Sequence, residues 1–184
     1  MNNLSDKQII QSCQNWLKQV VIKYNFCPFA RKEFEAKTIE YHICAHQNID
    51  LALEAIEQAC QKLDEIDHIS TTLVILPQGF ERFDSYLDLV DAAQSTIIDP
   101  QYEGIYQLAS FHPDYCFADS NNQDPANYTN RSPFPIVHII REAQLEQALE
   151  QYQHPESIPE KNIALTRRKG LAQMQALLAQ CSTN

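Results

Sequence analysis

Glycine is scarce in this 184-residue sequence, which contains only Gly79, Gly104 and Gly170. No segment therefore has the pattern G-x-G-x-x-G or G-x-x-x-x-G-K-[ST], in which glycine-rich backbone surrounds phosphate groups. Binding of ATP or a dinucleotide through either motif is excluded. Long hydrophobic runs are missing as well, because no stretch of about 18 apolar residues is present to span a bilayer. The first twenty residues are polar and amphipathic, so we expect no signal peptide.

Basic residues are also in short supply. The chain has 14 Lys and Arg against 24 Asp and Glu, a net charge of −10, and residues 47–100 carry eleven acidic side chains against Lys62 and Arg82. An acidic surface repels nucleic-acid phosphates and anionic lipids. We therefore expect neither a nucleic-acid partner nor a membrane partner. A small-molecule ligand is the expected partner.

The six cysteines form no C-x-x-C pair, so zinc-ribbon and thioredoxin-like motifs are absent. Reduced thiols in a cytoplasmic protein are the simplest interpretation of such scattered cysteines. No metal site is predicted from their spacing, and no cofactor follows from any motif in the chain.

Apolar periodicity divides the chain into helices and strands. Ser5 and Gln8 predict a capping box at the start of the first helix, and Pro28 is expected to end that helix. Helices are predicted over 5–24, 50–66, 81–94, 142–152 and 158–180, and strands over 38–44, 71–76, 105–111 and 136–140. The break at Gly170 is expected to interrupt the last helix.

The order of these elements predicts an α/β fold. Strands that alternate with helices pair in parallel through right-handed crossovers. The fourth strand follows the third without a helix between them, so it should run antiparallel to the third. We therefore expect a single domain over residues 1–184 with a mixed sheet of about four strands, mostly parallel with one antiparallel strand. Helices pack on this sheet, including the first (5–24) and the last (158–180).

A 24-residue connection, His112 to Pro135, joins the last two strands. Connections of this length without regular structure are uncommon in small domains and are usually functional or disordered. Five aromatic residues in and beside this connection favour packing over disorder: Phe111, Tyr115, Phe117, Tyr128 and Phe134. Ligands of open α/β sheets gather beyond the carboxyl ends of the parallel strands. We therefore expect the connection to cover that edge and to form a concave, charged site there.

Titrating groups and hydrogen-bond donors are concentrated in this connection. His112 is the candidate for proton transfer, oriented by the carboxylate of Asp114. Arg131, an always-charged planar donor, is the candidate for binding a phosphate or carboxylate, with Asn127 and Ser132 beside it. The alternative is that these side chains bind backbone groups and hold an irregular loop in shape, as Asn and Asp commonly do in turns.

For three further residues, a functional role competes with a structural one. His138 and Arg141 lie on one short strand and are candidate ligand-binding residues, although a histidine between isoleucines is more often part of a core. Cys27 is a candidate nucleophile. Its position just beyond a helix C-terminus gives a thiolate no support from the helix dipole, which favours an inert, packed thiol.

Four segments carry a resemblance to a known family: 25–30 (NFCPFA), 108–115 (LASFHPDY), 127–135 (NYTNRSPFP) and 158–162 (IPEKN). They resemble the signature stretches of domain-of-unknown-function family 1415 (DUF1415), a group of bacterial proteins of similar length. The resemblance covers nearly the whole chain, and it implies no reaction, substrate or cofactor. The resemblance implies that six candidates belong to the family's characteristic stretches, with His138 just beyond the third segment: Cys27, His112, Asp114, Asn127, Arg131 and His138.

Three hypotheses about function follow. The leading one is a small-molecule enzyme or binding protein for an anionic ligand, with His112, Asp114 and Cys27 in catalytic roles. The second is a metal-dependent hydrolase that uses His112 and Asp114. The third is a non-enzymatic interaction module that presents the acidic 47–100 surface to a basic partner and has no enclosed pocket near His112.

Overall fold

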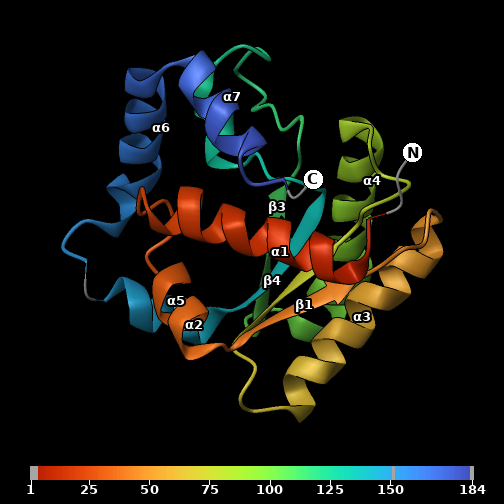
Figure 1. The fold of residues 1–184 in the computed structure, drawn as a ribbon. Coiled ribbons are helices and arrows are strands. Elements are labelled where there is room, and N and C mark those ends of the chain that lie inside the picture. The colour runs from red at the N-terminus through yellow and green to blue at the C-terminus, as the bar shows by residue number, and fades with distance from the viewer. Residues whose placement is uncertain (1–3, 151, 183–184) are drawn as a thin grey trace.

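The computed structural model describes residues 4–150 and 152–182, which form a four-stranded sheet with helices on both faces (Figure 1). The strands lie in the order β1 (Ile39–Ile43), β2 (Thr71–Ile75), β4 (Ile136–Arg141) and β3 (Tyr106–Phe111). The pair β1–β2 is parallel, whereas β2–β4 and β4–β3 are antiparallel.

The α/β class and the antiparallel pairing of β4 with β3 are confirmed. The expectation of a mostly parallel sheet is wrong, because only one of the three strand pairs is parallel. The reason is the position of β4, which inserts between β2 and β3 and pairs with both. Although β3 runs in the same direction as β2, the strand between them removes their parallel contact.

Two layers of helices cover the sheet because β2 and β4 bury both faces. Leu73 and Ile75 face the first layer, which contains α1 (Asp6–Trp16), its π-helical continuation η1 (Leu17–Ile22) and α2 (Ala30–Ala36). Val74 and Leu76 face the second layer. That layer consists of α3 (Ile49–Glu65), α4 (Phe83–Ala93) and the π-helical segment η2 (Gln94–Tyr102). Figure 1 shows α1 crossing in front of the sheet, on the side away from α3.

The C-terminal segment begins with a helix against β4 and continues with two helices, of which the first packs mainly on the long connection. It consists of α5 (Glu142–Leu149), the short 3-10 turn η4 (Pro155–Ser157), α6 (Ile158–Lys169) and α7 (Leu171–Ala179). The expected break occurs at Gly170, whose φ is +82°. The main neighbour of α6 is η3 (Pro125–Thr129), and α7 contacts η3 and η1. Among the described residues, no helix is long and apolar enough to cross a membrane.

The first helix ends differently from the expectation. Asn25 has a φ of +55°, and the Phe26 N–H donates to the Val21 carbonyl at 2.9 Å. A left-handed residue followed by such a bond is a common helix C-terminus, so the helix ends before Pro28 acts. A second helix, α2, then begins at Ala30, where the sequence indicated only a connection. Cys27 therefore lies between two helices.

Candidate functional site

The long connection folds back over the end of the sheet, as expected. The register aligns Ile75 with Ile43, and Ile136 with both Ile75 and Phe111, so the relevant ends of all four strands meet at one edge. The indole N–H of Trp16 donates to the carbonyl of Arg131 at 3.0 Å, which ties the connection to α1. Its polar candidates are largely enclosed: His112, Asn127 and Ser132 are fully buried and Arg131 is 8% exposed.

His112 is held by backbone groups on both sides of its ring. Its Nε2 lies 2.9 Å from the Phe80 carbonyl, and the Asp114 N–H donates to Nδ1 at 3.0 Å. A carbonyl only accepts, so Nε2 carries the proton and the ring is neutral. Burial lowers the pKa of His112 in agreement with that state. Neither nitrogen is left to accept a substrate proton or to bind a metal, and Asp114 orients the ring through its backbone.

Arg131 and its neighbours also bind backbone. The guanidinium of Arg131 donates to the carbonyls of Tyr115 and Asn122, both at 3.1 Å, and its planar group lies over the ring of Tyr128. Asn127 and Ser132 likewise bind backbone groups of the same connection, those of Phe117, Asn121 and Phe134. These contacts correspond to the alternative in which the polar residues hold the loop in shape.

Arg141 lies at the opposite end of β4 from the connection. Its guanidinium donates to the hydroxyl of Tyr106 at 3.2 Å and to the carbonyls of Leu63 and Ile69. The structure therefore does not bring Arg141 together with Arg131. Nor do the residues at 4–150 and 152–182 include a group of three or more His, Cys, Asp or Glu side chains suited to a metal ion.

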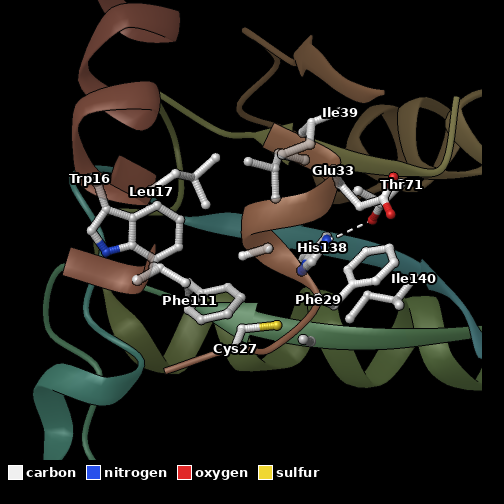
Figure 2. A pocket seen from close by; sticks show the side chains of 14 residues that line it. Trp16, Leu17, Cys27, Phe29, Glu33, Ile39, Thr71, Phe111, His138 and Ile140 are labelled. Carbon is white, nitrogen blue, oxygen red and sulfur yellow. Dashed lines mark hydrogen bonds between the residues drawn. The ribbon is translucent and has the colours of Figure 1, made fainter. Parts of the chain in front are cut away.

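A cavity lined in part by Phe111 lies between the sheet and the layer of α1, η1 and α2 (Figure 2). This inner cavity has a volume of about 120 Å³, close to the roughly 150 Å³ of an engineered apolar cavity that binds benzene. Three aromatic rings form much of its wall: Trp16 of α1, Phe29 just before α2, and Phe111 of β3. The cavity is therefore of a size and chemistry to hold one small ring.

Four polar side chains interrupt the apolar wall of the inner cavity: Cys27, Glu33, Thr71 and His138. Cys27 and His138 are among the residues predicted from the sequence. Glu33 and Thr71 were missed. The available signals were the spacing of Ala30 and Phe34 and the ion pair of Arg31 with Glu35, both four residues apart, which are typical of a helix.

His138 is fixed in a single tautomer by its neighbour. The hydroxyl of Thr71 lies 2.6 Å from the carbonyl of Ile139 and 2.7 Å from Nε2 of His138. A hydroxyl has one proton, and the carbonyl can only accept it. The Thr71 oxygen must then accept from His138, so Nε2 carries the ring proton and Nδ1 keeps a lone pair. Within the described part of the chain, no hydrogen bond to Nδ1 is formed.

The two cavity residues found from the sequence are both neutral. Burial lowers the pKa of His138 to about 4. Burial also raises the pKa of the Cys27 thiol, while the backbone N–H groups of Phe29 and Ala30, at the start of α2, act in the opposite direction. The sequence indicated only the helix C-terminus before Cys27. The structure adds amide donors from the next helix, which give the sulfur more support as a thiolate than the sequence implied.

We expect stability to fall as the pH is lowered from about 6.5 to about 4. In this window the unfolded chain protonates His138 and the folded chain does not, so protonation favours unfolding. The depressed pKa corresponds to about 3 kcal/mol. Burial lowers the pKa of His112 in the same direction, so it adds to the effect. Urea unfolding between pH 4 and 7.5 should show a shallower pH dependence for His138→Leu than for the wild type. Equal pH dependence in the two proteins would contradict the assignment.

Comparison with known proteins identifies the family. The family model described as "Protein of unknown function (DUF1415)" matches residues 8–176. No curated protein and no solved structure gives a significant match. The matched range contains all four strands and every residue that lines the inner cavity. The chain therefore belongs to the DUF1415 family.

Proposed function

We propose that this chain binds a compact, neutral and largely apolar molecule in the inner cavity, and that the ligand donates one hydrogen bond to Nδ1 of His138. The observation that carries the proposal is the lone pair on Nδ1 of His138, which has no hydrogen-bond partner among the described residues and lies in a cavity with a mostly apolar lining. An acceptor that meets apolar side chains in place of a donor forgoes the roughly 1 kcal/mol that a hydrogen bond contributes. A ligand that supplies the missing donor recovers that contribution and gains the burial of its apolar surface.

The charge of the site favours a neutral ligand over the phosphate or carboxylate compound expected from the sequence. No Lys or Arg side chain lines the inner cavity, whose one charged group is the carboxylate of Glu33. An anion there would lose its hydration without gaining a cation. The open depression beside Arg131 is less favourable for an anion than the sequence suggested. Three carboxylates, those of Glu81, Asp84 and Asp114, outnumber the guanidinium groups of Arg82 and Arg131 in its lining.

The proposal is tested with phenol and toluene, two rings of similar size that differ in one hydrogen-bond donor. Trp16 is the only tryptophan of the chain and lines the cavity, so its fluorescence reports occupancy. We expect wild-type protein to bind phenol about tenfold more tightly than toluene, which is the effect of one hydrogen bond of about 1.4 kcal/mol. In His138→Leu, phenol should lose this advantage while toluene binding is retained.

The matched control is His46→Leu, which changes an exposed histidine outside the cavity. It should leave both affinities at their wild-type values. Benzoate serves as the anionic probe and should bind more weakly than phenol. Equal affinity of the wild type for phenol and toluene, or tighter binding of benzoate with loss of binding in Arg131→Ala, would overturn the proposal. The latter result would restore the anion-binding hypothesis.

A further inference from the structure

A second hollow adjoins the inner cavity. This outer hollow has a volume of about 290 Å³ and is bordered by the first turn of α6, by Thr129 and Asn130 of the long connection, and by η1. Val21, Cys27 and Phe111 line both spaces and therefore form the partition between them. Cys27 thus stands between a wider, more polar entrance and a small apolar chamber.

We infer that Cys27 is a nucleophile that adds to an α,β-unsaturated carbonyl compound bound in the inner cavity, with Nδ1 of His138 accepting the thiol proton. This inference rests on the proposed function and names the substrate class of that site. Figure 2 shows the sulfur of Cys27 and the imidazole of His138 directed into the same cavity. The cavity therefore contains both a thiol and a basic nitrogen, the two groups that thiol addition requires. No hydrogen bond joins them among the described residues, so the proton passes to Nδ1 when bound ligand brings the thiol and the ring into contact.

The cavity favours addition over displacement. A displacement releases an anionic leaving group, and the inner cavity offers no Lys or Arg side chain to stabilise one. An addition releases nothing. The flat walls formed by Trp16, Phe29 and Phe111 suit a planar, conjugated ligand. A conjugated carbonyl compound is neutral and planar, and its soft alkene carbon is a good acceptor for sulfur.

The addition balances without a further reactant. The sulfur of Cys27 forms a bond to the β-carbon of the ligand, and the alkene π pair moves to give an enolate. The thiol proton passes to Nδ1 of His138 and from there to the α-carbon of the ligand. The product is a neutral thioether, and His138 returns to its original tautomer with Nε2–H still bound to Thr71.

His138 is better placed as the proton acceptor than Glu33, the only other titratable side chain that shares the cavity with Cys27. One carboxylate oxygen of Glu33 accepts a hydrogen bond from the Thr38 hydroxyl, and the other lies 3.9 Å from Nζ of Lys32. Nδ1 of His138 has no such partner. Because burial lowers the pKa of His138 to about 4, the ring is a free base throughout the neutral range.

The experiment treats the full-length protein with methyl vinyl ketone and follows each cysteine by mass spectrometry of its peptide. Cys116 is the internal reference, because it and Cys27 are the two free cysteines of intermediate exposure and it lies outside both hollows. We expect Cys27 to react at least about tenfold faster than Cys116 at pH 7. With iodoacetamide, which must release iodide, this ratio should be smaller.

The pH profile separates base catalysis from simple exposure of the thiol. With His138 as the base, the wild-type rate at Cys27 should be nearly constant from pH 6 to 8. In His138→Leu the rate at Cys27 should be at least about tenfold slower at pH 7. The rate in this variant should rise about tenfold for each unit of increasing pH, because below the thiol pKa the thiolate fraction rises in this way. Cys27→Ser should lose the adduct and keep phenol binding.

The outcomes distinguish this inference from the proposed function. If phenol binds through His138 but Cys27 reacts no faster than Cys116, the substrate class is wrong and the binding site stands. If the two reagents give the same Cys27 to Cys116 ratio, or if the His138→Leu profile equals that of the wild type, the assigned chemistry is wrong. If phenol does not bind and Cys27 is unreactive, both proposals fail.

Discussion

Replacement of His112 by alanine should lower the free energy of unfolding by about 4 kcal/mol. The fully buried ring donates to the Phe80 carbonyl and accepts from the Asp114 N–H. Alanine leaves both backbone groups without partners in a dry environment. It also removes a ring whose centroid lies 5.2 Å from the ring centroids of both Phe83 and Tyr86. The loss combines two unmade hydrogen bonds with an aromatic-sized void.

Urea unfolding followed by circular dichroism measures this effect, and His68→Ala is the matched control because His68 is exposed. The control should change the free energy of unfolding by less than about 0.5 kcal/mol. Binding of phenol by folded His112→Ala protein should remain close to that of the wild type, since His112 does not line the inner cavity. A stable His112→Ala protein that has lost ligand binding would instead return His112 to the catalytic role expected from the sequence.

Local patterns predicted the strands well because each strand is a short segment of alternating or continuous apolar residues between clear breaks. All four lie within about two residues of their expected bounds. Their order in the sheet was not predictable in the same way. The insertion of β4 between β2 and β3 depends on which edges the crossover helices leave open, and no single strand encodes that choice. The helix α2 was missed because it is only seven residues long and has few apolar positions to reveal its period.

The residue types of the site were predictable from the sequence, but the hydrogen-bond partners of these residues were not. The sequence singled out Cys27 and His138, and it also singled out His112 and Arg131. The two pairs differ in the hydrogen bonds that their polar atoms form. The polar atoms of His112 and Arg131 form hydrogen bonds with backbone groups of the connection and of Phe80. One nitrogen of His138 has no hydrogen bond within the described ranges. Those partners depend on loop geometry that spacing along the chain does not reveal.

Replacement of Trp16 by alanine should be the second large loss, about 4 kcal/mol. The indole is 1% exposed, packs edge-on against Phe111 with ring centroids 5.2 Å apart, and donates to the Arg131 carbonyl at 3.0 Å. That bond joins residues 115 positions apart, and it fastens the connection to α1. Alanine removes both the packing and the bond, and it leaves the carbonyl unpaired.

Trp16→Phe separates these two contributions, because phenylalanine keeps a ring against Phe111 and removes only the N–H donor and part of the volume. It should lose about 2 kcal/mol, roughly half of the alanine effect, in urea unfolding followed by circular dichroism. Because Trp16 forms a wall of the inner cavity, folded Trp16→Ala should also accept a larger ring, such as naphthalene, that the wild type excludes. Equal losses for the two variants would mean that the Arg131 bond, and not packing, accounts for the stability. An unchanged preference for ring size would show that Trp16 does not limit the cavity.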